Sequence, residues 1–598
     1  MPQNKGYLFS QREKVKVDFD EIPLSEYPRP SLKRDSYLCL NGCYDLTWNK
    51  EETLPTSYDH KILVPFALES ASSGVNYLVE PDDILYYHKH IVMPEGFQKE
   101  NTMIHFEGVD QYCEVYINGM IVASHMGGYT PFSVLLPFGI EKEFDLILKV
   151  KDVTDTSYHS RGKQVLDAQN GWFYSSSSGV YKPIWMESVG RYYIEDIQFT
   201  PDYDQKRVKV FVKTKEKGVA TLYIHSKPYT IHTNENEYIS LKEDFHPWSP
   251  SSPYLYSVKV IYENDQVLSY FGMRKIEIKE IDGKKRILLN EEPIFLSGLL
   301  DQGYYFVSNL TPRTYQDYLF DIQKSKELGF NCIRKHIKTE LDLFYYYCDK
   351  EGMILIQDFP CGGESYSFVA TVAPRLFTFL SEKNINYKNM KRENEEGRKE
   401  FERECREYLS MFHNHPSVLI YTIFNEGWGQ FDSSRIYHEL KEEDSFHLYD
   451  TASGWYDSDS DFYSIHSYSY PGMKRVDKKK RCFIFTEVGG ITLRVEENTY
   501  FEGCFGHGYA KTKEELLLKL QDLYNNKLIP QIDKYGLNMI IYTQLADCET
   551  EQNGLYTYDR KVLKVDKEEM CKLNQNAYDA LEKAVQKKGD SSWKEKKL

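Results

Sequence analysis

The sequence lacks several features that mark whole classes of protein. Its 598 residues contain no run near the roughly 20 apolar residues that a membrane-spanning helix needs. Residues 1–20 have no apolar core, so no signal peptide is expected. The 11 cysteines form no CxxC pair and are odd in number, which argues against a disulfide framework or a zinc site. Together these absences predict a cytoplasmic protein with reduced thiols.

Positive charge is also scarce. Lys and Arg number 74 against 90 Asp and Glu, and the net charge of −16 argues against a nucleic-acid partner. What the sequence has in quantity is apolar and aromatic mass, 41% and 15% of residues with 49 Tyr, which excludes wholesale disorder. Because one core stops growing at roughly 250–300 residues, we expect several domains in an enzyme or a binding protein.

Three domains and a tail are expected along the chain. Up to about residue 280, short β-rich runs alternate with turn sequences such as Asn-Gly at 41–42 and 118–119, which is typical of β-sandwiches. Strand and helix patterns then alternate, which predicts a (β/α)8 TIM barrel. The expected units are a jelly-roll β-sandwich over 1–192, an immunoglobulin-like β-sandwich over 193–283, the barrel over 284–585 and a basic tail over 586–598.

Eight strand candidates follow residue 284, which is the number that such a barrel requires. Helical patterns separate several of them, for example at 314–329 and 338–352, and a charged segment at 389–410 predicts a solvated helix. The fifth and sixth strands lack a clear intervening helix. The predicted strands are 295–300, 331–337, 353–359, 418–426, 447–455, 461–468, 482–488 and 539–547.

Active sites of these barrels lie at the carboxyl ends of the strands, so the polar residues there are the candidates for chemistry. Two carboxylates stand out, Glu426 and Glu487, because each ends an apolar strand and is followed closely by Gly. Glycoside hydrolysis needs such a pair, whereas an isolated strand-end Glu more often pairs with Arg or caps a helix. The candidate substrate-binding residues are Asp301, Arg334, Lys335, His336, Asp358, Asn425, Trp428, His466, Tyr468, Gln544 and Glu549.

Aromatic and cationic side chains near these ends have two interpretations each. Trp428, Trp455 and Tyr468 could stack on a sugar ring, or could simply pack in the core. Arg334 and Lys335 need a partner inside a barrel mouth. They would either adjust the ionisation of a catalytic carboxylate or bind an anionic group of the substrate.

The chain resembles glycoside hydrolase family 2 over nearly its whole length. The most specific motif is NHPSVLIYTIFNEGWGQ at 414–430, which is similar to the family's acid/base segment, and FTEVGG at 485–490 resembles its nucleophile segment. Further similar stretches are YPRPSLKRDSYLCLNGCYDL (27–46), VPFALES (64–70), YINGMIVASHMGGYTPF (116–132), SSGVYKPIWME (177–187), WSPSSPYLYSV (248–258), YFGMRKIE (270–277) and YTQLADCETEQNGLYTYDR (542–560).

This resemblance implies a retaining exo-glycosidase without a cofactor. Glu426 would be the general acid/base and Glu487 the nucleophile, with the carboxyls about 5–5.5 Å apart. Asn425 is similar to the family residue that contacts the sugar 2-hydroxyl, and Tyr468 to one that assists the nucleophile. Family members often form homo-oligomers. No metal is expected here, because the large metal-binding relatives carry further domains that this chain lacks.

Two departures from the family pattern bear on the substrate. Arg334-Lys335-His336 replaces an Arg-x-x-His stretch, and Asn553-Gly554-Leu555 stands where family β-glucuronidases have an Asn-x-Lys motif that holds the sugar carboxylate. We therefore expect a β-galactosidase-type enzyme first. The alternatives are a β-hexuronidase, for galacturonides or glucuronides, that uses Arg334 or Lys335 for the carboxylate, and a non-catalytic carbohydrate-binding protein.

Overall fold

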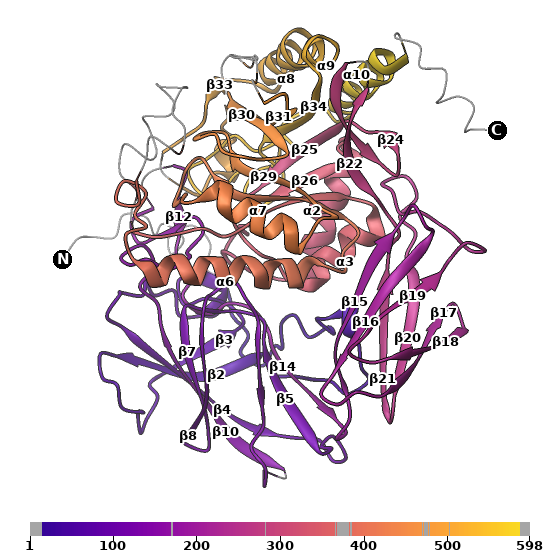
Figure 1. The fold of residues 1–598 in the computed structure, drawn as a ribbon. Helices are drawn as coiled ribbons and strands as arrows, with labels where there is room; N and C mark the ends of the chain where they lie inside the picture. Colours follow the sequence, from indigo (N-terminus) through magenta and orange to yellow (C-terminus); the bar gives the residue numbers. More distant parts are fainter. Residues whose placement is uncertain are drawn as a thin grey trace.

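The computed structural model describes residues 15–586, except 141, 169–170, 282, 365, 367–381, 383–385, 469–470, 472–476, 478 and 502. Figure 1 shows the N-terminal β-structure at the bottom, a second β-sandwich at the right, and the barrel at the top. The predicted basic tail lies outside the described residues apart from Gln586. None of the helices in the described ranges combines the length and the apolarity needed to span a bilayer.

The N-terminal domain is a sandwich of a six-stranded and a four-stranded sheet. Alternation in sequence gives each strand one buried face, as in Tyr112–Ile117, where Cys113, Val115 and Ile117 are fully buried. The six-stranded sheet has the order β3 (His60–Val64), β2 (Gly42–Asn49), β4 (Ile84–Val92), β10 (Glu143–Lys151), β7 (Tyr112–Ile117) and β8 (Met120–Met126). The four-stranded sheet has the order β1 (Leu38–Cys39), β14 (Ile184–Val189), β5 (Asn101–Phe106) and β9 (Phe132–Leu135). Short pairs join β11 (Gln164–Val165) to β12 (Tyr174–Ser175) and β6 (Val109–Asp110) to β13 (Gly179–Val180).

The second domain is a smaller sandwich of two antiparallel sheets. Its strands also alternate, and Val208, Val210 and Val212 all face the core between the sheets. One sheet has the order β15 (Ile194–Asp202), β16 (Arg207–Thr214) and β19 (Asn236–Ser240). The other has the order β18 (Lys227–His232), β17 (Val219–Ile224), β20 (Tyr256–Tyr262) and β21 (Asp265–Phe271).

A small antiparallel sheet joins the second domain to the barrel. It consists of β22 (Ile276–Ile281), β23 (Lys284–Leu289) and β24 (Glu292–Pro293). Ile276, Ile287 and Leu289 pack with the first residues of the barrel strands, so this sheet covers the amino end of the barrel. The proposed border at 283/284 falls in the β22–β23 turn.

The third domain is the predicted eight-stranded parallel barrel. The strand order β29-β28-β27-β26-β25-β34-β31-β30 runs around the barrel, and the edge strands β29 and β30 lie against each other. These strands lie where the sequence predicted them, which confirms the fold class. They are β25 (Leu296–Asp301), β26 (Cys332–Lys335), β27 (Ile354–Asp358), β28 (Val418–Asn425), β29 (Leu448–Ser453), β30 (Phe462–Ser467), β31 (Cys482–Gly489) and β34 (Leu537–Thr543).

Helices cover the outside of the barrel (Figure 1). In the charged segment, Asn394 caps α6 by accepting a hydrogen bond from the Gly397 amide, and Phe401, Cys405 and Tyr408 repeat at helical spacing on its buried face. In the described chain no helix lies between β29 and β30. The helices are α2 (Tyr315–Glu327), α3 (Asp342–Glu351), α6 (Glu395–Phe412), α7 (Ser433–Glu443), α8 (Lys513–Gln521), η5 (Asp522–Leu528), α9 (Ile529–Tyr535) and α10 (Lys567–Gln586).

A loop of the N-terminal sandwich lies directly on the barrel mouth. The Gly162 amide donates to the Cys361 carbonyl oxygen at 2.8 Å, and Ser160 pairs with Gly362 as an isolated β-bridge. Gly162 has φ of +61°, and a Cβ there would lie 2.5 Å from the Tyr129 hydroxyl oxygen. Only glycine fits this crossing, so the loop is held firmly over the carboxyl ends of the barrel strands.

Candidate active site

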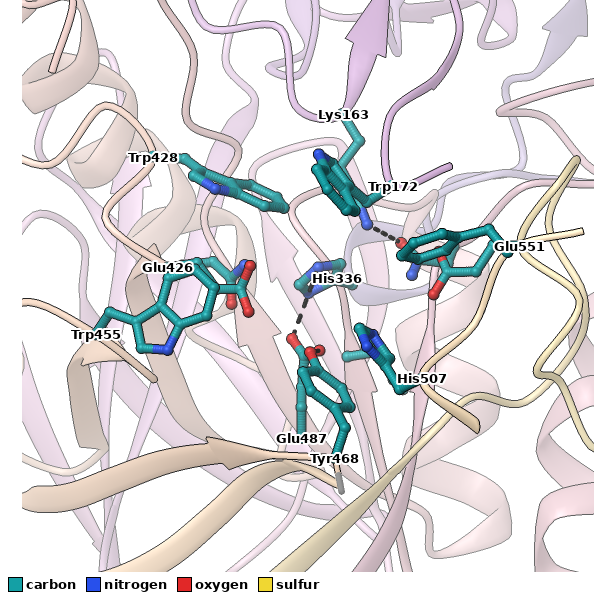
Figure 2. Close-up of a pocket in the computed structure, with 14 residues that line it drawn as sticks. Lys163, Trp172, His336, Glu426, Trp428, Trp455, Tyr468, Glu487, His507 and Glu551 are labelled. Atoms are coloured by element: carbon teal, nitrogen blue, oxygen red, sulfur yellow. Dashed lines mark hydrogen bonds and ion pairs between the residues drawn. The ribbon is translucent and has the colours of Figure 1, made fainter. Parts of the chain in front are cut away.

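A pocket lies at the carboxyl ends of the barrel strands, and Figure 2 shows side chains from two domains pointing into it. The strands bring their terminal polar residues to one place, as parallel barrel strands must. The lining residues are Lys163, Trp172, Leu300, Gln302, His336, Asn425, Glu426, Trp428, Trp455, Tyr468, Glu487, Phe505, His507 and Glu551.

Glu426 enters the pocket where β28 ends. Its φ of +50° and that of Gly427, +75°, turn the backbone sharply after Asn425, while the Glu426 amide still donates to the Ser453 carbonyl oxygen at 2.9 Å. The His466 Nδ1 lies 2.8 Å from Glu426 Oε1 and holds the carboxyl in place. A side chain at Gly427 would meet the Tyr456 ring at 2.3 Å, which explains the glycine after this strand.

Glu487 lies on β31, across the pocket from Glu426, among hydrogen-bond donors. Tyr468 donates to its Oε2 at 2.5 Å and Arg334 donates to its Oε1 at 3.2 Å. Burial alone would raise the pKa of the Glu487 carboxyl, but the His466 and His336 imidazoles, the Arg334 guanidinium and the Tyr468 hydroxyl hold that pKa well below its usual range. Glu487 is therefore ionised at neutral pH.

The two carboxyls are close together. Glu426, His466 and Glu487 each offer one atom that lies within 4.8 Å of the atoms of the other two. This distance is shorter than the roughly 6.5–9.5 Å that would leave room for a water molecule between two catalytic carboxyls. The same three side chains offer two carboxylate oxygens and one imidazole nitrogen, a donor set that suits a divalent cation.

A second network lies behind Glu487. Arg334 donates two hydrogen bonds of 2.9 Å to the two oxygens of Asp358 and one of 2.8 Å to Asn425 Oδ1. His336 Nδ1 lies 2.8 Å from the same Asp358 carboxylate. Burial lowers the pKa of His336 to about 4, so its ring is neutral at pH 7. The fork geometry of Arg334 fixes the side chains at the ends of β26, β27, β28 and β31 relative to one another.

Two polar atoms in the pocket have no hydrogen-bond partner among the described residues. They are Asn425 Nδ2 and Trp428 Nε1, both of which are donors. Because a buried donor without a partner costs free energy, these atoms are suited to donate a hydrogen bond to a ligand oxygen. For Asn425 this agrees with the role that the family resemblance implies.

Seven of the sequence candidates do not line the pocket. Arg334, Asp358 and His466 belong to the networks described above. The other four are Asp301, Lys335, Gln544 and Glu549. The Lys335 Nζ lies 2.6 Å from Asp301 Oδ2 and 2.8 Å from Glu340 Oε1. Gln544 donates to Asn553 Oδ1, and Glu549 accepts a hydrogen bond from the Ser175 amide of the N-terminal sandwich. Burial raises the pKa of Glu549 to about 7.

Apart from the apolar Leu300, and from Trp455, for which a stacking role was expected, six lining residues were not among the sequence candidates. Lys163 and Trp172 come from the N-terminal sandwich, whose contact with the barrel strand-end patterns cannot indicate. Gln302 directly follows a predicted strand end and could have been chosen. The others, Phe505, His507 and Glu551, lie on segments that follow β31 and β34.

The comparisons with known proteins agree with this architecture. Residues 280–480 match the family model described as "Glycosyl hydrolases family 2, TIM barrel domain", and residues 192–274 match "Glycosyl hydrolases family 2". A β-galactosidase of Thermoanaerobacter pseudethanolicus is 27% identical over 384 residues, which are 60% of this chain and 46% of that protein. A β-glucuronidase of Streptococcus agalactiae is 22% identical over 435 residues, covering 67% of this chain and 68% of that protein.

Among solved structures, a family 2 β-galacturonidase of Eisenbergiella tayi bound to galacturonate has a TM-score of 0.67 and 18% identity. It covers 92% of this chain and 99% of that chain, so the two folds agree across all three domains. The chain spans about half the length of the first curated relatives that it matches. With both matched domains and the fold of the whole chain in agreement, the chain belongs to glycoside hydrolase family 2.

Proposed function

We propose that this protein is a retaining exo-β-glycosidase that releases a terminal β-linked sugar through a covalent glycosyl-enzyme. The observation that carries the proposal is the pair of carboxyls, Glu426 and Glu487, with oxygens within 4.8 Å of each other in one pocket. The loop of the N-terminal sandwich that supplies Lys163 and Trp172 covers one side of this pocket, which favours a chain end over a chain interior.

In the first step Glu487 attacks the anomeric carbon while Glu426 transfers a proton to the departing glycosidic oxygen. The contacts around Glu487 support its role as nucleophile, because they keep its carboxylate ionised. Arg334 and Tyr468 hold that carboxylate, and Asn425 Nδ2 is available to a sugar hydroxyl. The bond to the aglycone breaks as the bond from Glu487 to carbon forms.

In the second step Glu426, now ionised, takes a proton from water as the water oxygen attacks the same carbon. The bond to Glu487 breaks and its carboxylate regains its charge, which Arg334 and Tyr468 stabilise. The sugar leaves with its original β-configuration. His466, which contacts Glu426 and lies 3.7 Å from Glu487, holds the two carboxyls in fixed positions relative to each other.

The identity of the sugar depends on the charges that face the pocket. The named relatives include β-galactosidases and β-glucuronidases, so a galactoside and a hexuronide are the two candidates. The prediction that Arg334 or Lys335 binds a sugar carboxylate is not supported. Arg334 is bound to Asp358, Asn425 and Glu487, and Lys335 is 0% exposed between Asp301 and Glu340.

The direct test is Glu487→Gln, assayed on a panel of 4-nitrophenyl β-glycosides. We expect turnover to fall by several orders of magnitude on every sugar, because an amide cannot form the glycosyl ester. The thermal unfolding midpoint should stay near that of the wild type. Nearly full activity in this variant would exclude the mechanism, and a wild type inactive on the whole panel would favour the non-catalytic alternative.

A further inference from the structure

Lys163 is the cation that faces the pocket. Among the described lining residues it is the lone Lys or Arg, and its side chain comes from the N-terminal sandwich rather than from the barrel. The residue is 6% exposed. Its Nζ lies 3.2 Å from Gln302 Oε1 and above the rings of Tyr174 and Trp428, at 4.8 and 5.6 Å from their centroids.

No carboxylate oxygen of the described chain lies within 4.0 Å of this ammonium group; the same holds for the buried Arg161 and Lys182, which donate to carbonyl and hydroxyl oxygens and do not line the pocket. Three other buried cations close to the barrel mouth each pair with an acid. Arg334 pairs with Asp358, Lys335 with Asp301, and Lys564 with Asp547. A buried ammonium with one amide oxygen as its hydrogen-bond acceptor has capacity for an anion, because a buried charge is stable only when it is paired.

The position of Lys163 is rigid. Its carbonyl oxygen accepts a hydrogen bond from the Tyr174 amide, and the preceding Gly162 is bonded to the barrel at Cys361. In Figure 2 Lys163 reaches the pocket from the side opposite Glu487, with His336 between them. The pocket therefore has a cation on the side away from Glu487, where a substituent of the sugar remote from its anomeric carbon can meet it.

The other charges in the pocket make this cation necessary for one substrate class. Glu426, Glu487 and Glu551 all line the pocket, and the whole chain carries −16, so an anionic sugar meets repulsion without a local positive charge. Burial raises the pKa of Glu551 and the nearby Lys163 charge opposes this rise, so Glu551 is the pocket acid that interacts with the ammonium group over a longer distance. A neutral hexoside would bring no anion to the Lys163 ammonium group.

We infer that the pocket accepts a β-linked hexuronide and that Lys163 of the N-terminal sandwich binds the sugar carboxylate. This inference rests on the proposed glycosidase function and names its substrate class. Lys163, a residue of another domain, thus takes the carboxylate-binding role that the sequence predicted for Arg334 or Lys335. It also accounts for a uronide site without a Lys at the Asn553-Gly554-Leu555 position.

The test compares 4-nitrophenyl β-D-galacturonide, β-D-glucuronide and β-D-galactoside for the wild type, Lys163→Met and Lys182→Met. Lys182 is a matched control, because it is also a buried sandwich lysine that reaches the barrel, donating to Thr339 Oγ1 at 3.0 Å, and it does not line the pocket. We expect a wild-type preference for one uronide over the galactoside. Lys163→Met should lower kcat/KM on that uronide at least about tenfold and change the galactoside by less than about threefold.

Several outcomes separate the inference from the proposed function. Lys163→Arg should keep part of the uronide activity, and Lys182→Met should leave the sugar preference unchanged. A galactoside-preferring wild type, or an equal loss on all sugars in Lys163→Met, would overturn the role of Lys163 while the glycosidase proposal stands. If the Lys163→Met variant does not fold, the affinities of the folded Glu487→Gln variant for free galacturonate and for free galactose are compared instead. Equal affinity for the two sugars overturns the inference.

Discussion

The hydrogen bond from Tyr468 to Glu487 gives the sharpest kinetic prediction. Tyr468→Phe removes one hydroxyl, which donates to Glu487 Oε2 at 2.5 Å, and keeps the ring that stacks on His507 at 3.5 Å between centroids. A hydrogen bond to a charged group contributes about 1.5–3 kcal/mol. At about 1.4 kcal/mol per factor of ten, its full loss corresponds to a factor of about 10–100.

Loss of this hydrogen bond affects the rates of the two chemical steps differently. Glu487 gives up charge during attack on the sugar and regains it when water cleaves the ester, so the hydroxyl stabilises the transition state of the second step more than its ester ground state. We therefore expect Tyr468→Phe to lower kcat about tenfold or more, with KM falling alongside and kcat/KM changing little. The pKa of Glu487 should rise, because one of the contacts that lower it is lost.

Stopped-flow release of nitrophenolate measures both steps. Slow cleavage of the ester should produce a burst close to one equivalent per active site, followed by a slow steady state. An equal fall in kcat and kcat/KM without a burst would refute this reasoning, and so would unchanged kinetics. An unchanged thermal midpoint is the control for folding, since the ring contact with His507 is retained.

Two further predictions concern Glu426 and Glu404. Glu426→Gln should lower the hydrolysis rate of glycosides with poor leaving groups by about 10²–10⁴-fold. The first step on 2,4-dinitrophenyl glycosides, whose leaving group needs no proton, should slow far less. Equal losses on both substrates would exclude Glu426 as the proton donor. Burial raises the pKa of Glu404 on α6 from 4.5 to about 8. Below pH 4.5 the carboxyl is protonated in both the folded and the unfolded chain. As the pH rises from 4.5 to 8, the unfolded chain loses this proton first, so the folded protein loses stability. Unfolding scans should show Glu404→Gln similar to the wild type at pH 4.5 and more stable at pH 8.5, by an amount on the order of 4 kcal/mol; parallel pH curves for the two proteins would contradict this.

The barrel and its two carboxylates were predictable because their determinants are local. Each barrel strand is a short apolar run, and Glu426 and Glu487 end two of these runs beside a glycine. Once eight such strands form one barrel, the fold places their ends around one mouth. Asn425 and Tyr468 follow from the same argument, because they are adjacent to strand ends.

The role of Lys335 shows where strand periodicity should have entered. Consecutive residues of a strand point to opposite faces, so Arg334 and Lys335 cannot both face the inside of the barrel. Arg334 lies inside with Glu487, and Lys335 lies behind the sheet with Asp301 and Glu340. Alternation along β26 was therefore sufficient to separate the two cations.

Lys163 could not be found in this way, because its place depends on contacts between domains. The residue is more than 130 positions before the first barrel strand, and the loop that carries it reaches the pocket through Gly162 and its bond to Cys361. Residue pattern indicates which face of a strand is buried, and it does not indicate which loop of one domain lies on another.

The most direct test of the central claim is to trap the glycosyl-enzyme. A 2-deoxy-2-fluoro β-glycosyl fluoride of the preferred sugar should react with one residue per chain, because the fluorine slows cleavage of the ester more than its formation. Mass spectrometry of peptides should then place one added fluorosugar on Glu487, and Glu487→Gln should remain unlabelled. Label on another residue, or hydrolysis of the reagent with inversion and no labelled protein, would contradict the account.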